Sequence, residues 1–218
     1  VAVADLEVSL AADRRGTHMS RLVELLHQHR ETVDFAGVEA LLEATADRLE
    51  AEEVRVTLRF AHFVTRTAPV SGTAGLLDLD VAFVGRRAGG RNTVQLEVTV
   101  PVQSLCPCSK AVSDYGAHNQ RGRVTVQITP TGPGLEPDAL AALVEAEASA
   151  PIYPIIKRGD ERHVTMQAYD NPVFVEDLTR GVAAALEAHP LVGAYRVRVV
   201  NEESIHNHQA VAERSGGR

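Results

Sequence analysis

The stretch NTVQLEVTVPVQ, residues 92–103, decides the fold class because its apolar and polar residues alternate strictly. One face carries Val94, Leu96, Val98, Val100 and Val102, and the other carries Thr93, Gln95, Glu97 and Thr99. This period of two predicts a long strand with one buried face. One-sided alternation is typical of antiparallel sheet with helices on a single face, whereas buried parallel strands form continuous apolar runs.

The same alternation and four helical patterns extend the prediction along the chain. Further strands are predicted in VADLEVSL (3–10), VRVTLRFAHF (54–63), LLDLDVAFV (76–84), RVTVQI (123–128) and YRVRVV (195–200). Helices are predicted in SRLVELLHQH (20–29), VDFAGVEALLEATADRLEA (33–51), EPDALAALVEAEA (136–148) and NPVFVEDLTRGVAAALEAH (171–189). Asp34 and Asn171 are the expected N-caps of the second and fourth helices, with Pro172 at the first helical position and Phe174 opening the apolar stripe. RRAGGRN, residues 86–92, is expected to be a hairpin turn.

The order of these elements predicts an α+β fold of two similar modules in tandem. A strand, two helices and a run of three strands are followed by a strand, two helices and strands again. We therefore expect modules at 1–115 and 116–218, each an antiparallel sheet with paired helices on one face.

Composition excludes several classes of protein. The chain has 218 residues, 44% hydrophobic and 23% charged, which is enough to bury a sizeable core. Its net charge of −7 argues against a general nucleic-acid binder, since phosphates require a basic face. No apolar stretch approaches the roughly 20 residues of a membrane span. We expect a cytoplasmic protein that binds neither nucleic acid nor membrane.

The only two cysteines follow the long strand directly. Cys106 and Cys108 in SLCPCSK are one residue apart, which is poor geometry for a disulfide, so reduced thiols are expected in an irregular, Pro-containing segment. A structural zinc site commonly uses four ligands, but a catalytic metal needs about three and leaves a position for water. The alternative is that two small thiols fill the core.

A second polar cluster, NEESIHNHQA, occupies residues 201–210. If this segment is extended, His206 and His208 share one face and can reach a single ion, or one can ligate while the other moves protons. Glu202 and Glu203 can orient an imidazole or act as a base. A solvated polar loop remains the alternative.

A third feature, residues 155–177, adds positive charge and carboxylates. Lys157 and Arg158 suit a phosphate-bearing substrate, and Asp160 and Glu161 offer carboxylate ligands. Glu176 lies off the apolar stripe, and its simplest interpretation is a solvent-facing residue stabilised by the helix dipole.

Four long motifs together resemble the prokaryotic type IB GTP cyclohydrolase I family. They are GTHMSRLVELL (16–26), SLCPCSKAVSDYGAHNQRG (104–122), PIYPIIKRGDERHVTMQAYDNPVFVEDLTR (151–180) and NEESIHNHQA (201–210). The resemblance implies the tunnelling fold, with two modules per chain assembling into a barrel and a homotetramer. It also implies conversion of GTP and water to formate and 7,8-dihydroneopterin triphosphate, the entry to folate and pterin synthesis.

The resemblance also assigns roles to individual residues. It implies a divalent cation, Zn, Mn or Fe(II), held by Cys106, His118, Glu161 and His206. Cys108, Glu203 and His208 would line the reacting centre, with Cys106, as catalytic groups. Glu176 would anchor the guanine edge, and Lys110, Arg121, Lys157 and Arg158 are candidate contacts for the triphosphate.

Three alternatives stay open at this point. Archaeal relatives of this family make a cyclic phosphate product. The nitrile reductase of deazaguanine synthesis has the same fold and a similar cysteine and glutamate, but it consumes NADPH. A metal-stabilised binding module without enzymatic activity would unfold when its metal is removed.

Overall fold

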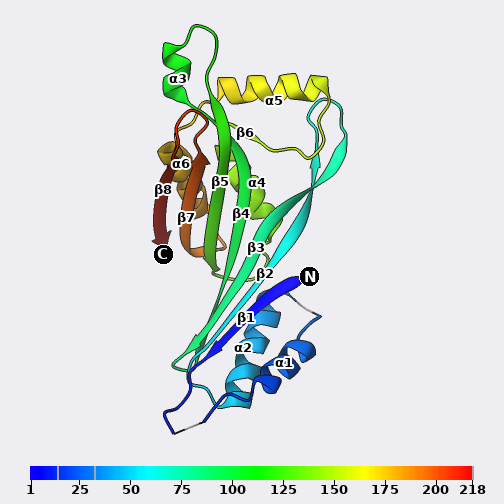
Figure 1. Cartoon of the computed structure of the whole chain (residues 1–218), viewed down its shortest axis with the longest axis vertical. Coiled ribbons are helices and arrows are strands. Elements are labelled where there is room, and N and C mark those ends of the chain that lie inside the picture. The colour runs from blue at the N-terminus through cyan, green and yellow to red at the C-terminus, as the bar shows by residue number, and fades with distance from the viewer. Residues whose placement is uncertain (14, 32, 218) are drawn as a thin grey trace. The chain divides into compact units, whose positions relative to one another are not determined.

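The computed structural model describes residues 1–13, 15–31 and 33–217. The expected strand and helix patterns form β1 (Ala2–Val8), α1 (Met19–Gln28), α2 (Phe35–Leu49), β2 (Val54–Thr67), β3 (Ala74–Ala88), β4 (Arg91–Leu105), β5 (Asn119–Pro130), α4 (Pro137–Glu147), α6 (Val175–Ala188) and β7 (Val192–Glu202). Four further elements are α3 (Pro107–Val112), β6 (Ala150–Pro151), α5 (Arg158–Asp170) and β8 (Gln209–Gly217). Figure 1 labels these elements along the chain.

The sheet is antiparallel in every pairing described, with strand order β1-β2-β3-β4-β5-β7-β8 and β6 paired to β4. Each long strand joins its sequence neighbour through a turn or through helices. The α+β class is therefore confirmed, because alternating strands bury one face and leave the other polar.

Contacts divide the chain into two compact units. The first contains Val1–Ala61 and Val81–Glu97, and the second contains His62–Asp80 and the chain from Val98 on. The predicted modules divide the sequence near residue 116, whereas the two compact units are defined by contacts between residues. The module boundary therefore stays a prediction.

In the first unit, α2 packs on the apolar face of the sheet. Asp34 caps the helix as predicted, its Oδ1 accepting from the Gly37 N–H at 2.7 Å. The ring of Phe35 meets that of Phe83 edge to face, with centroids 5.1 Å apart. A Cβ built on Gly85 would lie 2.7 Å from Val38 Cγ1, so only glycine lets this helix approach so closely.

Gly85→Ala is therefore expected to lower the free energy of unfolding by about 1–3 kcal/mol, because the added methyl overpacks a core that cannot easily yield. Gly132→Ala is the matched control, since a Cβ there meets nothing within 4 Å. Urea unfolding of both variants measures the difference. Equal stabilities would show that α2 moves freely away from the sheet.

In the second unit, α6 covers β7 and β8 and also packs on α4. Leu178, Val182 and Leu186 of α6 are fully buried, as their four-residue spacing predicts. Phe174 is 39% exposed, so it does not extend this stripe.

The predicted start of the fourth helix is wrong. Phe174 is the N-cap of α6, whereas Asn171 ends the preceding helix α5 and its side-chain amide donates to the Ala148 carbonyl at 2.8 Å. Pro172 consequently lies in the short link between the two helices. Because α5 buries only Asp160, Val164 and Ala168, its sequence carries too narrow an apolar stripe to predict a helix.

The hairpin turn predicted at residues 86–92 is confirmed. β3 ends at Ala88 and β4 begins at Arg91, with φ of 57° at Gly89 and 74° at Gly90. Positive φ at both central residues suits a two-residue hairpin turn, and glycine adopts it without strain.

Candidate active site at the ends of β4, β5 and β7

The segment after β4 is a short helix and not the irregular stretch that was expected. Cys106 is the N-cap of α3, and its Sγ accepts from the Ser109 N–H at 3.4 Å, while Pro107 occupies the first turn. Proline fits there because the first N–H groups of a helix lack intrahelical partners. Both cysteines are free, with Cys106 partly buried and Cys108 exposed. Figure 1 shows α3 beyond the ends of β4 and β5.

Backbone pairing brings Cys106 and His118 together. The Cys106 N–H donates to the His118 carbonyl at 3.1 Å, which closes the loop of α3 at its base. His118 Nδ1 lies 3.1 Å from Ser204 Oγ in the loop between β7 and β8. If Nδ1 carries the proton and donates to Ser204, Nε2 is the nitrogen able to bind a metal.

The loop between β7 and β8 carries the other predicted tail residues. Glu203 Oε1 accepts from Gln120 Nε2 at 3.3 Å, which ties the carboxylate to β5. Residues 203–208 are not extended, so the assumed strand geometry for His206 and His208 is wrong. Their rings nevertheless stack, with centroids 5.1 Å apart and planes 13° apart. Both imidazoles are exposed.

Glu161 lies at the other end of α5 from the cysteine segment. Lys110 of α3 reaches the last turn of α5, where its Nζ lies 4.3 Å from the ring centroid of Tyr169 and donates to the Tyr169 carbonyl. Glu161 is in the first turn, eight residues earlier, or about 12 Å along the helix axis. Lys157 and Arg158 begin the same helix and are exposed like Glu161.

The remaining substrate candidates are also exposed. Arg121 projects from β5, and Glu176 lies in the first turn of α6. Within residues 1–13, 15–31 and 33–217, no group of three or more His, Cys, Asp or Glu side chains is arranged to hold a metal ion. Hydrogen bonds within one chain thus connect Cys106 to His118, and His118 to the loop that carries Glu203 and His206. The described residues of one chain do not bring all four predicted ligands to one point.

Asp160 has a different role from the carboxylate ligand that its position suggested. It is fully buried, and its oxygens accept from the backbone N–H groups of Val70 at 2.7 Å, Ser71 at 2.8 Å and Lys157 at 2.9 Å. Asp160 therefore fastens the turn between β2 and β3 to the start of α5. Sequence spacing gave no signal for this bond, because the turn lies about ninety residues earlier in the chain.

These bonds predict a stability that depends on pH. The hydrogen bond from Ser71, together with the backbone donors, holds the pKa of Asp160 well below its usual range, although burial alone would raise it. The ionised form is bound in the folded state, so its contribution is full above the ordinary pKa near 4 and declines as the pH falls below it. Asp160→Asn should lower the Tm by on the order of 5 °C near pH 7, with a smaller difference below about pH 4. Thermal unfolding of both proteins across this pH range measures it, and a difference that stayed constant into acid would contradict it.

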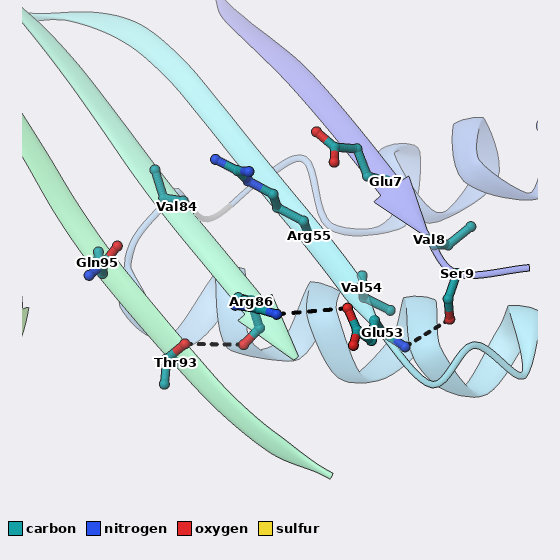
Figure 2. Close-up of a pocket in the computed structure, with 10 residues that line it drawn as sticks. All are labelled: Glu7, Val8, Ser9, Glu53, Val54, Arg55, Val84, Arg86, Thr93 and Gln95. Carbon is teal, nitrogen blue, oxygen red and sulfur yellow. Dashed lines mark hydrogen bonds and ion pairs between the residues drawn. The ribbon is translucent and has the colours of Figure 1, made fainter. Parts of the chain in front are cut away.

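The largest cavity described lies elsewhere, in the first unit. It has a volume of about 740 Å³ and is lined by residues of β1, β2, β3 and β4 (Figure 2). Its charged side chains balance, with Glu7 and Glu53 against Arg55 and Arg86, and Arg86 pairs with Glu53 at 3.8 Å. Among the described residues that line it there is no His or Cys, so they offer neither a soft metal ligand nor an imidazole for proton transfer.

Comparison with known proteins identifies relatives over nearly the whole chain. A family model described as type I GTP cyclohydrolase folE2 matches residues 1–212. The GTP cyclohydrolase FolE2 of Methylococcus capsulatus is 50% identical over 212 residues, covering 97% of this chain and 79% of that protein. The FolE2 of Bordetella petrii is 50% identical over 208 residues, covering 95% of this chain and 78% of that protein.

Uricases are among the solved structures that share this arrangement of elements. Arthrobacter globiformis uricase matches with a TM-score of 0.55 at 10% identity, covering 99% of this chain and 85% of that one. A hyperthermostable mutant of Bacillus sp. TB-90 urate oxidase matches with a TM-score of 0.62 at 8% identity, covering 100% and 86%. At this identity the likeness concerns the fold alone, which is the expected tunnelling fold. The sequence matches, in contrast, are long and close enough to establish kinship: this chain belongs to the type I GTP cyclohydrolase folE2 family.

Proposed function

We propose that this chain is a type IB GTP cyclohydrolase I, which hydrolyses GTP at C8, releases formate and forms 7,8-dihydroneopterin triphosphate. The observation that carries the proposal is the 50% identity to proteins named GTP cyclohydrolase FolE2 over almost the entire chain. The joined ends of β4 and β5 support it, because the backbone hydrogen bond from Cys106 to His118 makes a cysteine and a histidine neighbours.

The donor set suits a divalent cation of the Zn, Mn or Fe(II) type. Cys106, His118, Glu161 and His206 would hold it, because thiolate, imidazole and carboxylate ligands together suit these metals. When bound in such a site, a divalent cation would lower the pKa of water toward about 7 and so supply hydroxide at neutral pH. The hydrogen bond between His118 and Ser204 would fix the ring orientation that ligation requires.

The neighbouring side chains would handle protons and hold the substrate. Glu203, which accepts a hydrogen bond from Gln120, would accept a proton, and His208 and Cys108 would donate protons as the purine ring opens. Glu176 would accept hydrogen bonds from the guanine N–H groups. Lys157 and Arg158 would meet the triphosphate, with Lys110 and Arg121 as further candidates.

Assembly would complete the site. Glu161, Glu176, His206 and His208 are all exposed in one chain. A face that is exposed in one subunit can form the wall of a pocket with its neighbour. We therefore propose the homotetramer implied by the family, with barrels built from tandem modules. The described residues include no helix long and apolar enough to cross a membrane, and the cytoplasmic location stays a prediction.

The direct test is incubation of the purified protein with GTP under reducing conditions and a panel of Zn²⁺, Mn²⁺ and Fe²⁺. Formate and a pterin that fluoresces after oxidation should appear in equal amounts. Mass spectrometry of the product separates the linear triphosphate from a cyclic phosphate, and consumption of NADPH would instead indicate a reductase. Unfolding on metal removal, without any turnover, would favour a structural metal site.

A further inference from the structure

Two buried carbonyl oxygens beneath the candidate site have no hydrogen-bond donor among the described residues. They are the side-chain oxygens Oε1 of Gln120 and Oδ1 of Asn201. Asn201 is only 2% exposed. Native proteins pair the large majority of buried polar atoms with protein or with ordered water, so each of these oxygens requires a donor.

The orientation of the Asn201 amide is fixed by its neighbours. Its Nδ2 donates to Ser104 Oγ at 2.8 Å, and Ser104 Oγ in turn donates to the Val173 carbonyl at 3.1 Å. A hydroxyl has one hydrogen, so Ser104 can only accept from Asn201. Exchanging the amide nitrogen and oxygen would break this chain, and Oδ1 therefore points away from Ser104, toward Gly122.

The orientation of Gln120 is fixed in the same way. Its Nε2 donates to Glu203 Oε1 at 3.3 Å, and an ionised carboxylate can only accept. The amide atom left without a partner is therefore the Gln120 oxygen. Neither of the two unpaired oxygens can be explained by rotating its amide.

The two oxygens belong to the same face of neighbouring strands. Asn201 of β7 lies opposite Gly122 of β5 in the antiparallel register, and Gln120 is two residues before Gly122. Side chains two residues apart on a strand share a face, and such diagonal neighbours have Cα atoms about 7–8 Å apart. A Cβ at Gly122 would lie 2.9 Å from Asn201 Oδ1 and 3.0 Å from Val102 Cγ2, so only glycine leaves this oxygen uncovered by its own strand neighbour. A water molecule has two hydrogens, one for each oxygen.

We propose that a buried water molecule is bound between β5 and β7, donating to Gln120 Oε1 and Asn201 Oδ1, and that Gln120 is thereby a positioning residue for Glu203. A hydrogen-bonded chain then runs from Glu203 through Gln120, the water, Asn201 and Ser104 to the Val173 carbonyl.

This chain links the elements that bear the proposed catalytic groups. Ser104 lies two residues before Cys106, and Val173 lies three residues before Glu176. The water site stands on geometry alone, whereas the positioning role rests on the proposed function of Glu203.

A crystal structure of the wild-type protein at a resolution that shows ordered water tests the site itself. Electron density for one water within about 3 Å of both oxygens is expected. A protein donor on either oxygen, or no density between them, would overturn the water site. This result does not depend on whether GTP is the substrate.

Kinetics of Gln120→Leu and Asn201→Leu test the positioning role. Both should lower kcat by about 10–100-fold, as is typical when a partner of a catalytic group is removed, with KM for GTP changed less than about threefold. Thr45→Val is the matched control, because it removes one buried hydrogen bond, from Thr45 Oγ1 to the Leu41 carbonyl at 2.6 Å, far along the chain in α2. Its kcat should equal that of wild type.

An unchanged kcat in Gln120→Leu would overturn the positioning role of Gln120. If Asn201→Leu does not fold, the Gln120→Leu variant alone tests that role. Equal losses of kcat in Thr45→Val would also overturn it, because general destabilisation would then account for the effect. If the wild type releases no formate from GTP, the proposed function fails, and the crystal structure still decides the water site.

Discussion

Cys106→Ala is expected to abolish formate release from GTP while the protein stays folded. If Cys106 is a ligand of the cation, the variant should bind the cation poorly and so lose the positive charge that activates water. We expect kcat/KM to fall on the order of 1,000-fold or more, which corresponds to a rise of about 4 kcal/mol in the activation free energy. The fold should survive because Cys106 is only partly buried and caps a six-residue helix. Formate release and circular dichroism measure the two effects.

Val112→Ala is the control for the Cys106 variant. Val112 ends the same short helix and is 85% exposed, so its truncation should leave both the fold and the rate unchanged. A Cys106→Ala protein that retained more than a tenth of wild-type activity would remove the thiol from the proposed site. Loss of the far-ultraviolet sheet signal together with activity would instead favour a structural metal.

Glu176→Gln is the second change expected to have a large effect. An amide in place of the carboxylate loses charge-assisted acceptors for the guanine N–H groups, so kcat/KM for GTP should fall on the order of 100-fold, mostly through KM. Preference for GTP over ITP, which lacks the 2-amino group, should weaken in the same variant. Steady-state kinetics with both nucleotides measure this.

The alternative interpretation of Glu176 is a solvent-facing acid that stabilises its helix. Asp177→Asn is the matched control, because Asp177 shares the first turn of α6 and pairs with Arg180 on the surface. If both acids only stabilise the helix dipole, each variant should lose about 0.3–1 kcal/mol of its free energy of unfolding and should bind GTP as the wild type does. If Glu176→Gln binds GTP as Asp177→Asn does, Glu176 does not contact the base.

Strong periodicity made the strands and most helices predictable. The fully buried residues of β4, such as Leu96 and Val100, are those that the alternation places on one face. β8 was not predicted because its sequence, QAVAERSGG, consists mostly of small and polar residues. Its side chains are exposed or only partly buried, so no apolar face alternates with a polar one. α5 escaped because its surface is polar almost all round, and its start is held by the tertiary bonds of Asp160.

The candidate site was predictable in composition but only partly in geometry. The position of Cys106 after the long strand made it a candidate, the family resemblance added His118, and a backbone hydrogen bond joins the two residues. Neither the spacing nor the resemblance gave a signal for Ser204, Gln120 or Asn201, whose importance arises only when β5 and β7 lie side by side. Local sequence also cannot say which exposed residues a second subunit would cover, and the roles of Glu161 and Glu176 depend on that.

The most direct test of the account is anomalous diffraction from crystals of the assembled protein loaded with Zn²⁺ or Mn²⁺. The account predicts one cation per site bound to Cys106 Sγ at about 2.3 Å for zinc, with nitrogens of His118 and His206 at about 2.0–2.1 Å and Glu161 completing the set. A cation bound elsewhere would contradict it. So would Cys106 Sγ lying more than about 10 Å from every ring nitrogen of His118 and His206 in all subunits, far beyond any ligand distance.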